Sequence, residues 1–455
     1  MGQRVLWLIL LVSLVLRVSL ALSGGQAYWP DEDAGNPRLI LAALINHDFH
    51  EVFVRLDRPK HPLFMVMALV PAAIEFGTRS DLRIYALFVG MCSVLNIWLI
   101  ARIARVLGAG DVESLLAAGS LALSSAFFYW ARHVQPYDLA MTFALLALYA
   151  GLGAGRTNRR AYLCGILGAC SFLTYSGYWT TVAAVTLICV TQHSKRWPEV
   201  LRYGALAALG AGTVVGLAVG ASAALHGHFL QNVISYSGTI DQGTLEEGWS
   251  LPFEYLWHAE HLLLWVWIGC AASWLWAPRA IVTSPRLRAG FIGLVVIYAA
   301  LATCSVVLHQ FVVYGRLARQ LVPFFCLVAA HTFERLRMSQ HRSVRRLAVA
   351  VIVAMIVQAA LNFREPLLQS FPDDFMARNQ PGDAVTARYR GVIWVNAKHL
   401  YPGPAPLDLP SHYVTLAEAR HPLQFLPYQY EGYTPHQRQA LRSEDIRMRL
   451  LGVLP

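Results

Sequence analysis

Residues 28–35 read YWPDEDAG and residues 58–64 read RPKHPLF, and both belong to one long polar interval, residues 24–64. The interval follows the first hydrophobic segment of the chain. It opens with three consecutive acidic residues, Asp31, Glu32 and Asp33. It closes with three basic residues, Arg58, Lys60 and His61, which stand beside Pro59 and Pro62. An apolar chain does not need such a cluster to fold, so we interpret the interval as the functional centre, held against a membrane surface by the hydrophobic segments.

The overall composition indicates a polytopic membrane protein. Of the 455 residues, 56% are hydrophobic and only 14% are charged, whereas soluble proteins have about 25% charged residues. Many apolar stretches reach the length of about 17–25 residues that crosses the hydrocarbon core of a bilayer. The formal net charge of +10 would indicate nucleic-acid binding in a soluble domain. Here it is better explained by loop arginines that orient helices and attract anionic lipid or a phosphorylated substrate, and no nucleic-acid partner is expected.

Eleven apolar segments are predicted to span the membrane. The first, residues 4–22, is predicted to be a retained signal-anchor helix, and a cleaved signal peptide is the alternative. A further segment, residues 62–77, is short and contains Pro71 and Glu75, so we expect it to lie on the outer face as a juxtamembrane helix. The other predicted spans are residues 84–104, 114–131, 138–153, 161–175, 177–192, 201–224, 258–277, 289–308, 319–334 and 347–362.

The positions of arginine and lysine predict the orientation of these spans. If residues 62–77 do not cross the membrane, the loops that lie inside hold nearly all the basic residues of the membrane portion, as the positive-inside rule requires. These loops are residues 105–113, 154–160, 193–200, 278–288 and 335–346. The short outside loops hold only Arg132, Arg316 and Arg319. We therefore predict a multi-pass protein of the cytoplasmic (inner) membrane whose first outer loop, residues 24–82, faces the periplasm or exterior.

The apolar periodicity stops near residue 363, which divides the chain into a transmembrane domain, residues 1–362, and a C-terminal domain, residues 363–455. The C-terminal part contains a strand-like run, AVTARYRGVIWV, and a helix-start pattern at Thr434-Pro435. Because aromatic residues are frequent there, we expect a small α/β domain on the outer surface instead of a disordered tail.

Two motifs of the first outer loop have both a structural and a functional interpretation. The acidic run either stabilises the start of a helix or supplies a general base or a metal ligand at the mouth of a membrane cavity. The basic residues of RPKHPLF either reach the lipid headgroups or hold a lipid-linked phosphate.

Two further motifs belong to later outer loops. In ARHVQPYDLAMTF, residues 131–143, Asp138 enters an apolar helix, where an unpaired carboxylate is costly. Asp138 is therefore expected to face a cavity, to cap the helix or to pair with Arg132. In YGRLARQLVPFF, residues 314–325, Arg316 and Arg319 are three residues apart and share a helix face, where they either anchor at the interface or bind a phosphate leaving group.

In this order and on one predicted face, the four motifs resemble those of the GT-C superfamily of membrane glycosyltransferases. The most similar branch is the family 39-like enzymes, which include protein mannosyltransferases and the bacterial lipid A aminoarabinose transferase. The resemblance covers residues 1–362 and includes an Arg-x-x-x-Pro pattern from Arg319 to Pro323. The chain departs from the usual double proline of the second motif, since His61 stands between Lys60 and Pro62.

The resemblance implies a role for each motif. The catalytic acids would be Asp31 as the base, Glu32 beside it and Asp138, and Asp33 is the alternative base. The residues that bind the donor phosphate would be Arg58, Lys60, His61, Arg316 and Arg319. The residues that contact the acceptor or the sugar would be Asp33, Arg132, His133 and Tyr137.

The implied reaction is an inverting transfer of a sugar from a polyprenyl phosphate, in bacteria undecaprenyl phosphate, to a hydroxyl or amine of a glycolipid, polysaccharide or protein. No cofactor is predicted with certainty, and a divalent metal shared by Asp31 and Asp138 is left open. The seven cysteines form no CxxC pair and indicate neither disulfides nor a zinc site. Two rival functions are a transporter or flippase with charges along its pathway and a polysaccharide ligase or polymerase with a diphosphate-linked donor.

Overall fold

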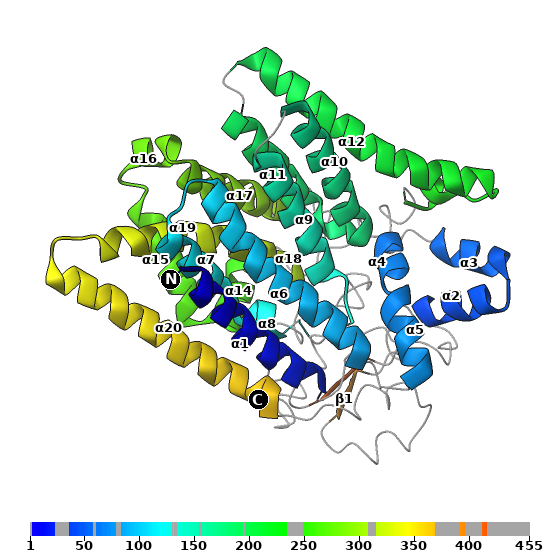
Figure 1. The fold of residues 1–455 in the computed structure, drawn as a ribbon, viewed down its shortest axis with the longest axis horizontal. Helices are drawn as coiled ribbons and strands as arrows, with labels where there is room; N and C mark the ends of the chain where they lie inside the picture. The colour runs from blue at the N-terminus through cyan, green and yellow to red at the C-terminus, as the bar shows by residue number, and fades with distance from the viewer. Residues whose placement is uncertain are drawn as a thin grey trace.

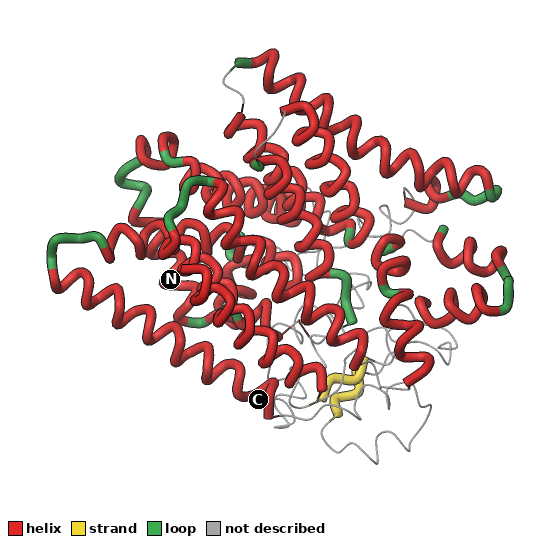
Figure 2. Tube along the Cα trace, viewed as in Figure 1, coloured by secondary structure: helices red, strands yellow, loops and turns green. Residues whose placement is uncertain are grey.

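The described part of the chain is almost entirely helical (Figures 1 and 2). The computed structural model describes residues 2–22, 36–57, 61–78, 83–129, 131, 134–153, 157–193, 196–233, 249–307, 315–368, 392–395 and 412–415. The two strands in these ranges, β1 (Val392–Val395) and β2 (His412–Thr415), pair antiparallel with Val392 opposite Thr415.

Long apolar helices form the framework of the molecule. Within the described ranges, five helices are long and apolar enough to cross a bilayer: α1 (Gly2–Leu22), α6 (Arg83–Val106), α12 (Trp197–Ala224), α17 (Pro285–Ala302) and α20 (Arg342–Leu368). Three shorter apolar helical stretches within the described residues are Pro62–Ile74, α9 (Tyr137–Leu152) and α15 (Leu262–Ser273). Every predicted span coincides with one helix or with two consecutive helical segments, and the prediction of a polytopic helical membrane protein is confirmed.

The remaining helical segments complete or connect these helices. They are α7 (Asp111–Ala122), α8 (Ser125–Tyr129), α10 (Thr157–Thr174), η3 (Ser176–Tyr178), α11 (Trp179–His193), α14 (Leu251–Glu260), α16 (Pro278–Thr283), the π-helical turn η4 (Thr303–Val307), α18 (Gly315–Ala318), η5 (Arg319–Leu321) and α19 (Val322–Arg337).

Two predicted spans are interrupted. The span predicted over residues 114–131 is divided at Ser124 into α7 and α8. The span predicted over residues 258–277 is divided at His261, which has a φ of 47° and separates α14 from α15. Both interruptions bring polar groups to one place, because the side chain of Glu260, the last residue of α14, contacts Ser124 and the start of α8.

The centre of the bundle is formed by α6, α7, α9 and α19, where α6 packs on α7 and α9, and α7 packs on α19. Every residue of α19 from Val322 to Phe333 is buried, so this helix has no side that could face lipid along that length. At the periphery, α10 and α12 cross closely. A Cβ on Gly165 of α10 would lie 1.9 Å from the carbonyl oxygen of Ala207, and one on Gly210 of α12 would lie 2.1 Å from that of Tyr162. Glycine is required at both positions, as at other close crossings of membrane helices.

The first outer loop folds into short helices beside the bundle (Figure 1). They are α2 (Asn36–Ile45), α3 (Phe49–Leu56), α4 (Pro62–Met67) and α5 (Leu69–Thr78). The segment predicted as one juxtamembrane helix is thus two helices that meet at Ala68, and its placement on the outer face stays a prediction. Asp57 connects α3 to the end of α12, because its Oδ1 accepts from Ser222 Oγ at 2.5 Å and its Oδ2 accepts from the His228 amide at 2.9 Å.

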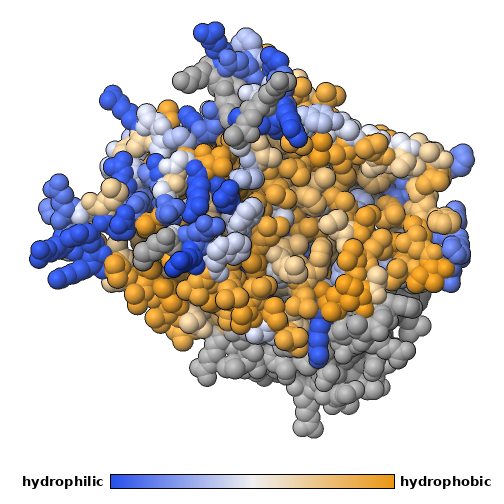
Figure 3. Space-filling view, viewed as in Figure 1, coloured by the Kyte–Doolittle hydropathy of each residue, from blue (hydrophilic) through white to orange (hydrophobic). Residues whose placement is uncertain are grey.

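The surface is divided by polarity. Figure 3 shows an apolar band across the molecule, with hydrophilic side chains gathered on one side of it, around α16 and the start of α20. A belt of this kind is what the hydrocarbon core of a bilayer requires.

The C-terminal domain is only partly within the described residues. Helix α20 extends to Leu368, which is beyond the predicted end of the last span at residue 362. The strand-like run that begins at residue 384 contains β1. The predicted helix start at Thr434 lies outside the described residues, and the α/β domain as a whole stays a prediction.

Candidate active site

A buried ion pair joins the first turn of α9 to η5, the short helical turn that precedes α19. Oδ1 of Asp138 lies 2.7 Å from Nη2 of Arg319, and the two side chains are 1% and 0% exposed. A lone charge is costly in such surroundings, so each group makes the burial of the other tolerable. Sequence alone offered Arg132 as a partner of Asp138. The structure pairs Asp138 with Arg319. Arg132 lies outside the described residues, so its pairing with Asp138 stays a prediction.

The position of Asp138 is fixed by α6. Its backbone oxygen accepts a hydrogen bond from Nδ2 of Asn96 at 3.0 Å and lies 2.8 Å from the hydroxyl of Thr142. The same hydroxyl lies 2.9 Å from Oδ1 of Asn96. Asn96 and Thr142 are both buried, and buried polar groups of this kind are tolerated when they are hydrogen-bonded to one another. The start of α9 is thereby held at a defined place on α6.

The position of Arg319 is fixed from two sides. Oε1 of the next residue, Gln320, accepts hydrogen bonds from Thr180 at 2.9 Å and Thr181 at 2.5 Å, and its Nε2 donates to the carbonyl of Gly177 at 3.1 Å. These bonds hold η5 against the start of α11. On the other side the Arg319 guanidinium carbon lies 4.1 Å from the ring centroid of Phe127 in α8, a cation–π contact.

A second buried cation lies near this pair. Arg17 of α1 is 2% exposed. Its Nε donates to Ser93 Oγ at 2.9 Å, its Nη1 donates to the backbone oxygen of Ser13 at 3.3 Å, and its charge acts on both Asp138 and Arg319. These three side chains contribute two guanidinium groups and one carboxylate, and the buried carboxylate of Glu260 also acts on Arg319.

Several polar atoms of this cluster have no hydrogen-bond partner within the described part of the chain. They are Oδ2 of Asp138, Nε and Nη1 of Arg319, and Nη2 of Arg17. Buried polar groups are paired in the great majority of cases. The guanidinium N–H groups without a partner can donate hydrogen bonds to a water or an anionic ligand, whereas an apolar ligand would leave them unpaired.

An aromatic chain connects the second sequence motif to this pair. His61 has left-handed backbone (φ 59°) immediately before α4, and its buried ring lies 5.0 Å from the ring of Tyr175. Tyr175 in turn lies 5.0 Å from Tyr137, the neighbour of Asp138 in α9. The helices that follow His61 pack on α6 and α9 through a small apolar cluster that includes Phe64, Ala68 and Leu139. The structure therefore brings His61, Tyr137, Asp138 and Arg319 into one region.

A buried glutamate was not anticipated from the sequence. Glu260 is 0% exposed, and its carboxylate accepts from Ser124 Oγ at 2.5 Å and from the amides of Ser125 and Ala126 at 2.9 and 3.0 Å. These three bonds satisfy the carboxylate and fix the start of α8, the helix that presents Phe127 to Arg319. The signal that points to it is a lone acid in an apolar, Trp-rich stretch; Arg17 gives the same kind of signal within the first span.

The other predicted site residues are not placed by the structure. Outside the described residues lie Asp31, Glu32, Asp33, Arg58, Lys60, Arg132 and His133. Arg316 belongs to α18, and its side chain is not described. Their roles stay predictions.

The described surroundings of Asp138 do not by themselves form a site for a divalent cation. Within the described residues no group of three His, Cys, Asp or Glu side chains is arranged to hold a metal. One Asp138 oxygen is engaged by Arg319, and Arg17 adds a second positive charge nearby. Two cations beside one carboxylate favour an anion over a metal ion. A metal that also uses Asp31 stays a prediction, since Asp31 lies outside the described part.

Comparison with known proteins gives no match at the level of sequence, because neither a protein-family model nor a curated protein matches the chain. Solved structures do match. ArnT from Cupriavidus metallidurans in the apo state superposes with a TM-score of 0.57 at 13% identity, covering 92% of this chain and 84% of that chain. The same protein bound to undecaprenyl phosphate gives a TM-score of 0.57 at 14% identity, covering 97% and 88%.

A third match is the Archaeoglobus fulgidus oligosaccharyltransferase in the apo form, with a TM-score of 0.50 at 12% identity over 88% of this chain and 60% of that chain. At such identities a likeness establishes the fold alone. ArnT and this oligosaccharyltransferase are both GT-C superfamily members. The chain therefore has a GT-C-like membrane fold, as its four motifs predict.

Proposed function

We propose that the protein is a glycosyltransferase that moves a sugar from a polyprenyl phosphate to an acceptor hydroxyl or amine. The observation that carries the proposal is the buried Asp138–Arg319 pair with Arg17 near it, which leaves guanidinium N–H groups without a hydrogen-bond partner within the described residues. A phosphate of the lipid-linked donor supplies acceptor oxygens for these N–H groups.

The proposed chemistry is a single displacement. Asp31 takes the proton of the acceptor hydroxyl or amine, and the freed oxygen or nitrogen attacks the anomeric carbon. The bond from that carbon to the phosphate oxygen breaks, and polyprenyl phosphate leaves with the electron pair. Because attack and departure lie on opposite sides of the carbon, the anomeric configuration inverts. Glu32 stands beside the base in the sequence.

The cationic residues stabilise the departing phosphate as negative charge develops on it. Nε and Nη1 of Arg319 are the donors left over after Asp138 has engaged Nη2. Donors held in place before the reaction lower its barrier because they need no reorganisation during it. In this proposal Asp138 orients Arg319, His61, Lys60, Arg58 and Arg316 complete the phosphate site, and the residues near Tyr137 contact the sugar or the acceptor.

The structural neighbours support the class of donor. ArnT, the lipid A aminoarabinose transferase, has the same fold and has been seen bound to undecaprenyl phosphate. A lipid of this kind is therefore the first donor carrier to test here. The acceptor is proposed only as a class, namely a glycolipid, a polysaccharide or a protein.

We further propose eleven spans, a catalytic domain over residues 1–362 and a C-terminal extracytoplasmic domain over residues 363–455. The direction of α19 supports the orientation, since this helix leads from the candidate site at Arg319 to the basic segment that starts at Arg335. If the basic segment lies inside, as the positive-inside rule requires, the candidate site faces the periplasm or exterior.

The buried cations are also compatible with a transporter or flippase for a lipid-linked anion, because charges inside a bundle mark substrate pathways. The same assay separates the two functions. A transferase produces free polyprenyl phosphate and a glycosylated acceptor, whereas a transporter leaves its lipid chemically unchanged.

The test uses the purified full-length protein in detergent, incubated with membrane lipid extract and analysed by mass spectrometry. Wild type should retain a polyprenyl phosphate or its sugar conjugate. Arg319→Ala should retain less of it, and Asp31→Asn should retain it without turnover. Absence of polyprenyl lipid from wild type and both variants would contradict the proposal.

A further inference from the structure

The helix α20 begins with three arginines that lack an acidic partner. Arg342, Arg345 and Arg346 are exposed, and their spacing of three and four residues places them on one side of the helix. No acidic residue stands in the first turn of α20. Like charges at this spacing repel one another, and the N-terminal end of a helix is itself positive. An anion at this point removes both unfavourable interactions.

Other arginines close by in the chain are already engaged. Arg337 donates twice to the carboxylate of Glu334, at 2.7 and 2.8 Å, and Arg335 lies 5.5 Å from the ring of Trp274. By contrast, within the described ranges neither a salt bridge nor a side-chain hydrogen bond is formed by Arg342, Arg345 or Arg346. Unneutralised positive charge is therefore concentrated on α20.

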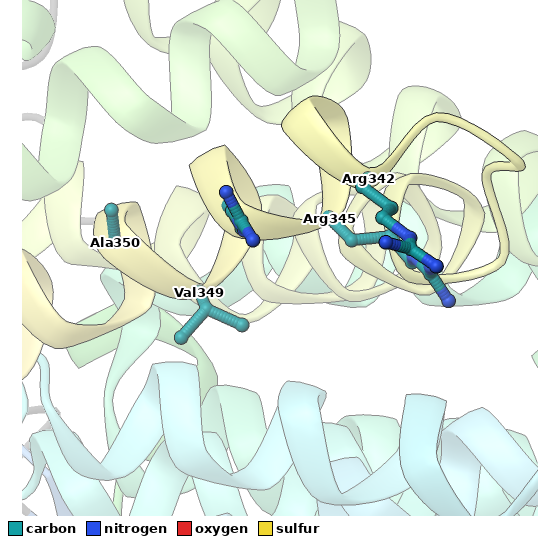
Figure 4. Close-up of a pocket in the computed structure, with 5 residues that line it drawn as sticks. Arg342, Arg345, Val349 and Ala350 are labelled. Atoms are coloured by element: carbon teal, nitrogen blue, oxygen red, sulfur yellow. The ribbon is translucent and has the colours of Figure 1, made fainter.

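These side chains border an open depression of about 470 Å³. Its lining combines the three arginines with Val349 and Ala350. Figure 4 shows Arg342 and Arg345 at the start of the helix and Val349 and Ala350 farther along it. The depression thus has a cationic end and an apolar end, which is the polarity of a phospholipid.

The apolar end continues along the same side of α20. Val349, Val353, Ile356 and Val357 are 60%, 52%, 50% and 54% exposed, and their positions repeat with the period of the helix. The opposite side carries the buried residues Ala348, Met355, Ala359 and Phe363. One leaflet of the hydrocarbon core is about 15 Å thick, which equals about ten helical residues. The exposed side chains after Arg346 cover that length.

We propose that this end of α20 binds an anionic phospholipid, with the phosphate between Arg342, Arg345 and Arg346 and an acyl chain along the exposed apolar side. A zwitterionic lipid carries a compensating cation and leaves the three arginines unneutralised. The helical stretch from Arg319 to Arg337, about 27 Å long, separates this site from the Asp138–Arg319 pair. The lipid site is therefore distinct from the candidate active site.

The test measures lipid binding to delipidated full-length protein in neutral detergent by native mass spectrometry, with thermal unfolding as a second readout. The probes are phosphatidylglycerol, phosphatidylcholine and inorganic phosphate. Wild type should bind phosphatidylglycerol in preference to phosphatidylcholine and should unfold at a higher temperature with it. Replacing all three arginines by glutamine should lower the affinity for phosphatidylglycerol by about 100-fold.

Matched variants keep the test decisive. Arg337→Gln removes an arginine that is neutralised by Glu334. It should leave the preference for phosphatidylglycerol over phosphatidylcholine unchanged. Arg345→Gln alone should lower the affinity about fivefold, which gives a result even if the triple variant does not fold. The proposal is overturned if wild type does not distinguish the two lipids, if the triple variant keeps the preference, or if inorganic phosphate stabilises as strongly as phosphatidylglycerol.

Discussion

The guanidinium of Arg319 stacks on the ring of Phe127, with 4.1 Å between the guanidinium carbon and the ring centroid, while its Nη2 is bonded to Asp138. The side chain is thus held by a ring on one side and a carboxylate on another. Its remaining donors, Nε and Nη1, have a fixed direction before any ligand arrives. This arrangement makes the arginine a pre-oriented phosphate ligand, and it leads to the predictions below.

Asp138→Asn should destabilise the protein, because it leaves the Arg319 charge buried without its partner. Breaking a buried pair by removing one member costs about 3–5 kcal/mol. The double variant Asp138→Asn/Arg319→Gln should be less destabilised than the sum of the two single variants. Thermal unfolding of the four proteins in one detergent measures this coupling, and strictly additive effects would contradict the ion pair.

Phe127→Leu should weaken retention of the polyprenyl lipid while the protein stays folded. Leucine keeps an apolar side chain at the site but removes the aromatic face, whose contact with a desolvated cation contributes about 2 kcal/mol. Phe325→Leu is the control, because that buried ring stacks on Trp267 in a contact between two aromatic rings. Equal loss of lipid in both variants would show that the effect is one of packing alone.

Arg17→Gln should reduce donor affinity more than tenfold, since it removes one of the two positive charges near the phosphate site. Arg17→Lys keeps the charge and should retain most of the affinity, although it loses the hydrogen bond to Ser93. The readout is the KM for the donor compared with kcat. A purely structural role for Arg17 would instead lower the unfolding temperature of both variants and leave the KM unchanged.

Asp31→Asn should abolish transfer without altering the unfolding temperature or the retained donor, because the amide cannot accept the proton of the acceptor. Asp33→Asn is the comparison, since the acidic run leaves the choice of base open. Loss of turnover in the Asp33 variant with normal turnover in the Asp31 variant would reassign the base. Both assays use the donor identified by mass spectrometry.

Much of the helical framework could be predicted from the sequence, because each apolar run has the length and composition of a span and helices satisfy their own backbone in lipid. The interruptions at Ser124 and His261 could not, since a few polar residues in an apolar stretch do not by themselves show where a helix breaks. They depend on a tertiary contact, namely the carboxylate of Glu260 bonded to Ser124 and the start of α8.

The sequence predicts Asp138 and Arg319 as site residues but not their pairing with each other. Asp138 and Arg319 each stand out as charges at the edge of an apolar helix, yet they are 181 residues apart, and hydrophobic periodicity contains no information about which helices are neighbours. The pairing of Asp138 with Arg132, which is closer in sequence, stays a prediction because Arg132 lies outside the described residues. Arg17 and Glu260 were visible as charges in apolar segments, but only the folded bundle shows that they border the same region.

Helix α20 is fixed to the bundle near its C-terminal end. The 22 residues from Arg342 to Phe363, which include the three arginines at the start of the helix, measure about 33 Å, and the hydrocarbon core is about 30 Å thick. Near its far end Gln358 donates to the backbone oxygen of Glu260 at 2.8 Å, and Asn362 donates to Ser125 at 2.9 Å.

A bilayer of a different thickness is therefore expected to change the tilt of α20. Because Asn362 is bonded to Ser125, that change would reach α8, the helix that carries Phe127. Donor affinity is expected to differ between short-chain and long-chain vesicles, which makes hydrophobic mismatch a physical variable of this protein.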